Sequence, residues 1–354
     1  MCGFMLTFDV AMPAALFVVT LAAMLLNKRI EAKLKTTFEE REFRRRDAIL
    51  FVAMISVGVS VIVFVPQMAI LALFLFSYSA LLFTFSYIFS DMRKRRAQLF
   101  CLGFGLAALV AGTVALLNSL MFNGAVALLG LAVFAFVALV FEQKRSDVKQ
   151  RWYLAVMPPA LFVLLFLVYN GTSLWFPFLL DTYGVIFAVL VILYLGSLFT
   201  WKSALIFAGL LTIMDIIMVL VTGVMVTAAQ TVSGLGLPVL ISLPTLPLII
   251  TKWGIQFMSL GLGDFFFAGI LATQTFRKFG KRTAVLSAIA MSVSFGIFEA
   301  LLLTYKFGAF PGTLMIICGW LPVIAWKLFA ERKNKEKTGQ ERHIQEQDTN
   351  KVDK

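Results

Sequence analysis

Long apolar runs separated by short polar segments make up most of the chain. Eleven of these runs approach the ~20 mostly apolar residues that a membrane-spanning helix needs. Two boundaries between neighbouring runs each depend on a single residue pair, Pro66-Gln67 and Trp201-Lys202. The pattern predicts an all-α polytopic membrane protein with about nine to eleven transmembrane helices. The predicted spans are residues 9–27, 48–66, 68–90, 98–117, 124–141, 152–169, 183–200, 203–222, 254–277, 283–304 and 311–329.

The composition agrees with a membrane protein. Of the 354 residues, 60% are hydrophobic and 14% are charged, whereas soluble domains have about 45–50% and about 25%. This excludes a soluble enzyme, a nucleic-acid-binding protein and a disordered chain. The single histidine, His343, lies in a polar tail, and the three cysteines are scattered along the chain. The sequence therefore predicts neither a metal site nor a cofactor.

The basic residues alternate between loops, and those that follow even-numbered spans include only Lys252 and Lys306. Because Lys and Arg are retained on the cytoplasmic side, the N-terminus is predicted outside and the C-terminus in the cytoplasm. The net charge of +12 then reflects topology and contact with anionic lipids. Residues 331–354 mix both signs, which indicates a solvated, mobile tail. The basic residues after odd-numbered spans are Lys28, Arg29, Lys33, Lys35, Arg41, Arg44, Arg45, Arg46, Arg93, Lys94, Arg95, Arg96, Lys144, Arg145, Lys149, Arg151, Lys202, Arg277, Lys278, Lys281 and Arg282.

Three acidic residues, Asp215, Asp264 and Glu299, lie well inside predicted spans, whereas Asp9 and Asp181 lie near span ends and are interpreted as interfacial. An acidic side chain at mid-membrane costs about 2.5–3.5 kcal/mol on translocon scales, so its default interpretation is functional. The alternative for a single acid is a helix-packing hydrogen bond, or a carboxylic acid kept neutral by burial. For Glu299 both interpretations, and a contribution to the field around the aspartates, stay open.

The two aspartates are predicted at one depth. Asp215 lies as many residues after Lys202 as Asp264 lies before Arg277, about 20 Å at the rise of an α-helix. Antiparallel helices would bring the two carboxyl groups together. Such a pair shares a proton and titrates as a unit. Such a pair can hydrolyse a peptide bond. One carboxylate acts as general base on a water, and the other, protonated, acts as general acid on the carbonyl of the bond that is cleaved.

The residues around Asp264 support this interpretation. In Gly261-Leu262-Gly263-Asp264, two glycines precede the acid, so that a substrate backbone can approach and the helix can loosen. The alternative is a small-residue packing motif. Glycines and prolines interrupt residues 234–247, which predicts a partly extended or re-entrant external segment. It could serve as a substrate gate or as a plain connecting loop.

These motifs resemble the presenilin and signal peptide peptidase family of intramembrane aspartyl proteases over residues 204–322. That family has one catalytic aspartate in a Tyr-Asp pair, a second in Gly-x-Gly-Asp on the next helix, and Pro-Ala-Leu two helices later. Here the corresponding residues are Met214-Asp215, Gly261-Leu262-Gly263-Asp264 and Pro311-Gly312-Thr313. The resemblance implies catalytic roles for Asp215 and Asp264. It implies substrate-binding roles for Gly261, Leu262, Gly263, Pro311, Gly312 and Thr313.

The chain departs from the family pattern at two motifs. Met214 replaces the tyrosine, and Gly312-Thr313 replaces Ala-Leu; a literal Pro159-Ala160-Leu161 lies upstream of both aspartates and is interpreted as coincidence. The predicted orientation resembles signal peptide peptidases and is opposite to presenilins. The expected substrates are transmembrane peptides or single-span proteins with a cytoplasmic N-terminus, including signal-peptide remnants.

The chain divides into four predicted parts: N-terminal membrane helices with a basic cytoplasmic loop (1–97), scaffold helices (98–202), catalytic helices with both aspartates (203–330) and a polar cytoplasmic tail (331–354). Three alternative functions stay open. An ion- or proton-coupled transporter could use the same buried carboxylates. A prepilin-type peptidase also has Gly-x-Gly-Asp, but it cleaves near the cytoplasmic face. The altered third motif also fits a proteolytically inactive homologue.

Overall fold

The computed structural model describes residues 8–37, 44–144, 151–252, 254–305 and 308–352. Parts of two predicted basic loops, 38–43 and 145–150, lie outside these ranges, as do Cys2 and Lys306. In chain order the elements are α1 (Ala11–Thr37), α2 (Arg45–Ile62), α3 (Gln67–Ile88), α4 (Lys94–Leu117), α5 (Phe122–Lys144), α6 (Trp152–Tyr169), the π-helical turn η1 (Trp175–Leu179), α7 (Leu180–Leu198), α8 (Trp201–Ile216), the π-helical turn η2 (Ile217–Val221), α9 (Val224–Ser233), β1 (Leu240–Pro244), β2 (Ile250–Thr251), β3 (Gly254–Ile255), β4 (Phe257–Gly261), α10 (Leu262–Phe279), α11 (Lys281–Tyr305) and α12 (Gly312–Val352).

The prediction of an all-helical polytopic membrane protein is confirmed. Within the described residues, eight helices are long and apolar enough to cross a membrane, and α1 and α9 contain shorter apolar stretches. The structure also has both of the helix boundaries that the sequence marks with a single residue pair. Pro66 directly precedes α3. Because a proline lacks the N–H that a continuing helix needs, the chain breaks between α2 and α3 here. Before α8 the Thr200 side chain accepts a hydrogen bond from the Ser203 N–H and caps the helix.

The predicted span at 254–277 is wrong in its first part. Residues 257–261 form β4, which pairs antiparallel with β1 from Leu240↔Gly261 to Pro244↔Phe257. This pairing satisfies the backbone polar groups of both segments inside the protein, which irregular backbone at membrane depth requires. The expectation that 234–247 is partly extended agrees with β1. A second short hairpin, β2 with β3, and the helix α9 were not predicted.

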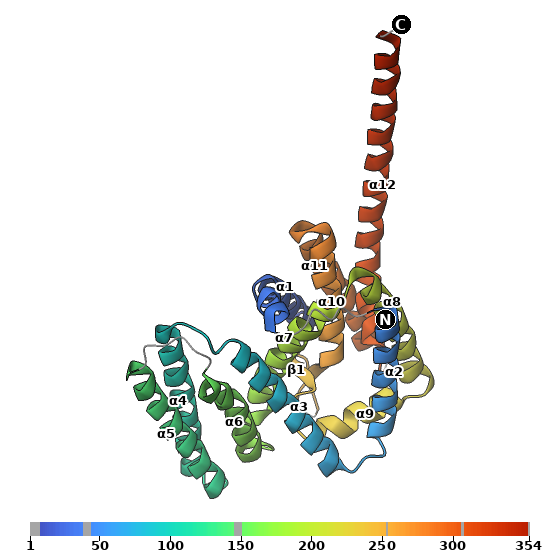
Figure 1. Cartoon of the computed structure of the whole chain (residues 1–354). Helices are drawn as coiled ribbons and strands as arrows, with labels where there is room; N and C mark the ends of the chain where they lie inside the picture. Colours follow the sequence, from blue (N-terminus) through green and yellow to red (C-terminus); the bar gives the residue numbers. More distant parts are fainter. Residues whose placement is uncertain (1–7, 38–43, 145–150, 253, 306–307, 353–354) are drawn as a thin grey trace.

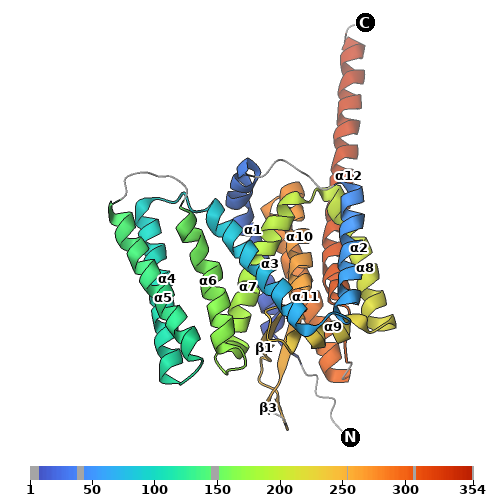
Figure 2. The same cartoon turned by 60° about the horizontal axis from the view of Figure 1, so that its bottom comes forward.

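The last predicted span agrees with the apolar, membrane-length part of α12, Gly312–Glu331. The helix itself does not end there, because α12 continues in helical form to Val352. Glu, Lys, Gln and Arg, which are good helix formers, make up much of this segment. Figures 1 and 2 show the C-terminal part of α12 extending away from the helix bundle, while the β3 hairpin projects at the opposite end in Figure 2.

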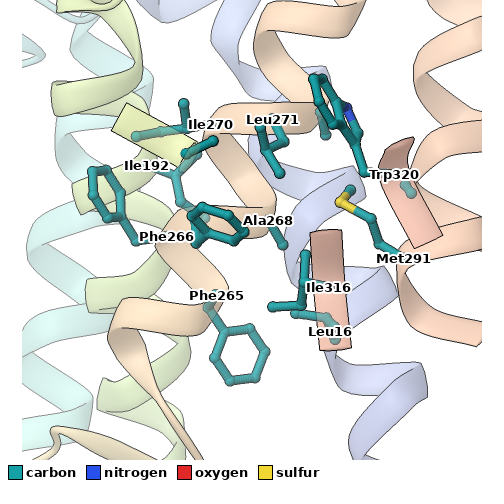
Figure 3. Packing of buried hydrophobic residues seen from close by; sticks show 14 of the residues in the cluster. Leu16, Ile192, Phe265, Phe266, Ala268, Ile270, Leu271, Met291, Ile316 and Trp320 are labelled. Atoms are coloured by element: carbon teal, nitrogen blue, oxygen red, sulfur yellow. The ribbon is translucent and has the colours of Figure 1, made fainter. Parts of the chain in front are cut away.

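Helix α10 lies at the centre of one half of the molecule, whereas α4 and α5 lie at the far edge of the other (Figures 1 and 2). The helices α1, α7, α8, α11 and α12 all contact α10, and every residue from Phe265 to Thr275 is buried. Figure 3 shows side chains of the surrounding helices, such as Leu16, Ile192 and Trp320, packed around it. This packing therefore holds the first turn of α10, and the side chains on it, in a fixed position.

Candidate active site

Asp264 occupies the first turn of α10, directly after β4. Gly261 is the N-cap residue, so Asp264 is the third helical residue, the position from which an acidic side chain reaches back to the N-cap backbone. The backbone of Gly261 does hydrogen-bond the Asp264 carboxyl group. A Cβ atom at Gly261 would lie 3.3 Å from Asp264 Oδ2. The Gly-x-Gly-Asp spacing therefore places the acid at the third position of a helix, where its side chain bonds the N-cap backbone.

Polar ties and one close helix contact fix α10 behind Asp264. The Gln274 side-chain amide donates to the carbonyl oxygens of Phe199 (2.7 Å) and Gly196 (3.2 Å) at the end of α7. Trp320 Nε1 on α12 donates to Thr275 Oγ1 at 3.0 Å. A Cβ at Gly269 would come within 2.5 Å of Ile192, so α10 and α7 pack closely. These contacts restrict sliding of α10 against its neighbours.

Asp215 is the second-last residue of α8, directly before the π-helical turn η2. Its side chain receives two hydrogen bonds from the start of α12. The Thr313 hydroxyl donates to Asp215 Oδ2 at 2.6 Å, and the Thr313 backbone N–H donates to the same oxygen at 3.2 Å. Asp215 therefore takes the part that an N-cap side chain plays at other helices.

The dipeptide Gly312-Thr313 brings the two aspartates together. Thr313 contacts Asp215, while a Cβ at Gly312 would lie 2.6 Å from both Cγ and Oδ1 of Asp264. The backbone of the first turn of α12 therefore abuts both carboxyl groups, which are close enough to interact electrostatically. Both aspartates are half-buried, and Gly263 beside them is exposed. Two neighbouring carboxyl groups with an accessible face can share a proton and activate a water.

Two other predicted site residues have backbone roles beside the pair. The Leu262 N–H donates to the Val239 carbonyl at 3.0 Å, which ties the start of α10 to the start of β1. Pro311 is buried, and its carbonyl accepts the Met315 N–H in the first turn of α12. Leu262 and Pro311 thus hold the two helix starts that carry the site.

The hairpin beside Asp264 has one occupied edge. The Ser242 N–H of β1 donates to Asp181 Oδ1 on α7 at 2.7 Å. The Ser242 N–H therefore points away from β4, so Ser242 and its partner Ser259 are a non-hydrogen-bonded pair. In such a pair the backbone groups of both residues point outward, so those of Ser259 point away from β1. Among the described residues, β4 has β1 as its sole strand partner. The outer edge of β4 therefore leads, without a further strand, towards Asp264.

Asp9 and Asp181, interpreted from the sequence as interfacial, have structural roles that the sequence did not predict. Asp9 is buried and caps α1 by accepting the N–H groups of Ala11 and Met12, and it also accepts the Leu246 N–H at 2.6 Å. An aspartate two residues before an apolar run is a recognisable cap signal. For Asp181 no local pattern could have revealed the contact, because Ser242 is distant in sequence.

Glu299 does not join the aspartate pair. It lies on α11, is 1% exposed and interacts electrostatically with Asp9. Neither of its carboxyl oxygens has a hydrogen-bond partner within the described residues. The helix-packing hydrogen bond, one of the interpretations that the sequence left open, is thus not seen among the described residues. Within the described ranges, no three His, Cys, Asp or Glu side chains gather into a group that could hold a metal ion.

The model of the signal peptide peptidase family matches residues 35–316, well over half of the chain. Comparison with curated proteins gives no significant match. The matched range contains Asp215, Asp264 and the dipeptide that contacts both. The resemblance predicted from the motifs is confirmed. The chain belongs to the signal peptide peptidase family, whose members are multi-pass intramembrane aspartic endopeptidases.

Proposed function

We propose that this chain hydrolyses peptide bonds within transmembrane segments, with Asp215 and Asp264 as its catalytic pair. The observation that carries the proposal is the contact of one dipeptide, Gly312-Thr313, with both carboxyl groups. Three helix ends, from α8, α10 and α12, converge there. No covalent intermediate is needed, because a water activated by one carboxylate attacks the carbonyl that the other carboxyl protonates.

The hairpin supports an extended substrate. A peptide bond inside a helix is shielded by side chains and by its own hydrogen bonds, so the substrate must unwind before water can reach the carbonyl. The outer edge of β4 offers backbone groups at Ser259 that an unwound segment can pair with, as in other strand-addition modes. We propose that Gly261, Leu262, Gly263, Pro311 and Gly312 line the path from this edge to the aspartates, and that Thr313, which is 4% exposed, supports this path through its contact with Asp215.

The proposed orientation follows from the basic loops. With the N-terminus outside and the C-terminus in the cytoplasm, α8 leaves the cytoplasm and α10 returns to it. Substrates are then single-span proteins with a cytoplasmic N-terminus, including signal-peptide remnants. Reconstituted enzyme should cleave such a segment and spare the same segment inserted in the reverse orientation. Cleavage of the reversed segment alone would contradict the proposed orientation.

The alternatives are weaker. Membership of a protease family favours hydrolysis over ion-coupled transport by the same carboxylates. An inactive homologue would need the altered third motif to disrupt the site, whereas Gly312 and Thr313 both contact the aspartates.

The decisive experiment is incubation of the purified full chain with a signal-peptide-like transmembrane peptide, followed by mass spectrometry. Wild type should release two fragments, and Asp264→Ala none. Peptidase activity that survives Asp264→Asn would contradict the aspartate pair. Sodium or proton flux that Asp215→Asn abolishes, without proteolysis in wild type, would favour the transporter.

A further inference from the structure

The contacts of the two aspartates differ in a way that separates their roles. Asp215 Oδ2 accepts two hydrogen bonds, one from a hydroxyl and one from a backbone N–H. Both donors belong to Thr313, which is 4% exposed. Hydrogen bonds to a carboxylate favour its ionised form. Among the described residues, Asp264 is hydrogen-bonded by the backbone of Gly261 alone.

The helix that carries Thr313 adds to this difference. Thr313 is the second residue of α12, a helix that extends to Val352. The first N–H groups of a helix have no partner within it, and its N-terminus carries a partial positive charge. An anion is therefore stabilised at this position. Asp215 accepts one of these N–H groups directly, at 3.2 Å.

The other ionisable groups on the elements around Asp215 are few. Beyond its first turn α2 has none, and α9 has none along its whole length. On α10 the group that interacts with Asp215 is Asp264. The remaining ones on α2, α8 and α10 lie in the first or last turn of these helices, at Arg45, Arg46, Asp47, Lys202, Arg277 and Lys278. Helix α12 also packs against α8; its described ionisable side chains are Cys318, more than one turn beyond Thr313, and Lys327, Glu331 and Lys333, which begin about 20 Å further along the helix.

We infer that Thr313 is a positioning residue that holds Asp215 as the ionised general base, which leaves Asp264 as the protonated general acid of the pair. This inference rests on the proposed function and deepens it. Neither motif of the family predicts it, because the chain has Met214 in place of a hydroxyl-bearing tyrosine and Thr313 in place of a leucine. Residue 214 has no hydroxyl to offer Asp215, and Thr313 on α12 supplies one instead.

The assignment gives a balanced reaction. The Asp215 carboxylate takes a proton from water as the water oxygen bonds to the scissile carbonyl carbon, and Asp264 gives its proton to the carbonyl oxygen. Asp215 then passes its proton to the amide nitrogen as the C–N bond breaks. Asp264 recovers a proton from one of the two hydroxyl groups on that carbon. The products are a carboxylic acid and an amine, and both aspartates return to their starting states.

The test compares Thr313→Val, Thr313→Ser and Thr212→Val in the full-length enzyme across a pH series. Thr313→Val keeps the N–H and the shape but loses the hydroxyl. It should lower kcat by about 10- to 100-fold, the size of a hydrogen bond to a charged group, and move the acidic limb of the profile to higher pH with little change in KM. Thr313→Ser should restore both. Thr212, a buried residue on α8 whose hydroxyl donates to its own helix at Ala208, is the matched control and should keep the wild-type profile.

Infrared difference spectroscopy gives a readout that does not depend on turnover. The band of a protonated carboxyl group should be lost in Asp264→Asn and retained in Asp215→Asn. The inference is overturned if Thr313→Val keeps the wild-type kcat and pH profile, if Thr313→Ser behaves like Thr313→Val, or if the band is lost in Asp215→Asn instead. In each case hydrolysis that still requires both aspartates leaves the proposed function intact. Hydrolysis that survives their replacement would contradict that function itself.

Discussion

Helix α10 and the α4–α5 pair are both apolar helices in one chain, yet different contacts hold them. The facing positions of α4 are small, at Ala97, Cys101, Gly105, Ala108, Gly112 and Ala115. A Cβ at Gly112 would lie 2.9 Å from the Leu129 side chain of α5, so the two helices approach closely. Small residues allow such packing in lipid, where the hydrophobic effect does not drive association.

Most directional polar contacts at α4 and α5 lie at one end; towards the other end, the Tyr169 hydroxyl donates to the Ala111 carbonyl of α4. Glu142, at the end of α5, forms an ion pair with Arg151 at 2.8 Å, and both side chains are almost fully buried. Arg151 also donates to the carbonyl oxygens of Ser90 and Met92. By contrast, α10 is held at both ends: the Leu262 N–H at its start donates to the Val239 carbonyl, and Gln274 and Thr275 near its end bond to α7 and α12. The α4–α5 pair is held mainly by close packing, whereas the helix that presents an acid is also fixed in register by hydrogen bonds.

The largest expected effect breaks the chemistry and leaves the packing intact. Asp264→Asn should lower peptide hydrolysis by at least about 10³-fold, because general acid–base groups contribute ~10²–10⁴-fold each and the pair acts as a unit. The thermal unfolding midpoint in detergent should stay close to that of wild type, since asparagine matches aspartate in shape. Mass spectrometry of the cleaved peptide measures the first effect and a melting curve the second. An inactive variant that also unfolds early would not test the pair, and Asp215→Asn is then the substitute.

The next effect is on stability and belongs to the other region. Glu142→Ala should destabilise the protein by about 3–5 kcal/mol, because it leaves the buried Arg151 charge unpaired. Hydrolysis per folded molecule should not change. The double variant Glu142→Leu with Arg151→Leu removes both charges and should recover most of the stability. A double variant as unstable as Glu142→Ala would show that the ion pair itself, rather than the unpaired charge, decides stability.

A smaller effect on activity tests the dipeptide between the aspartates. Gly312→Ala introduces the alanine that the family pattern has at this position, yet its Cβ would press against the Asp264 carboxyl group. The carboxyl must shift, and a misplacement near 1 Å can cost about 10²-fold in rate, so kcat should fall by about 10- to 100-fold. Gly130→Ala on α5 is the control, because a Cβ there meets no atom within 4 Å. Equal kcat in the two variants would contradict the close contact.

The smallest effect concerns Glu299 on α11, a helix that packs against α10. Its buried carboxyl oxygens lack partners within the described residues, and an unsatisfied buried polar group costs about 1–3 kcal/mol. Glu299→Met, of similar length, should therefore raise stability by about 1 kcal/mol and leave hydrolysis unchanged. A melting curve and a peptidase assay measure both. A marked fall in activity would instead assign Glu299 to the field around the aspartates.

Much of the helical architecture could be predicted from local pattern. Apolar runs of membrane length predicted eleven spans, of which the one at 254–277 is strand in its first part, and Pro66 and Thr200 marked breaks whose cause is local backbone chemistry. The position of Asp264 at a helix start also has a local cause, since the Gly261-to-Asp264 spacing matches that of an N-cap and its third helical residue. Residue counting and the helical rise predicted the two aspartates at one depth, and in the structure one dipeptide contacts both carboxyl groups.

Other features depend on residues far apart in the sequence. The strand at 257–261 looks like part of an apolar helix until its pairing with β1 is known. The Thr313 hydroxyl meets Asp215 only because α12 begins where α8 ends, and Asp181 meets Ser242 only across α7 and β1. Hydrophobicity along a chain determines which segments enter the membrane, because the free energy of transfer into the membrane is a sum over the residues of a segment. A hydrogen bond depends on a distance and an angle between two groups, so the arrangement of polar groups around the aspartates was decided by tertiary packing.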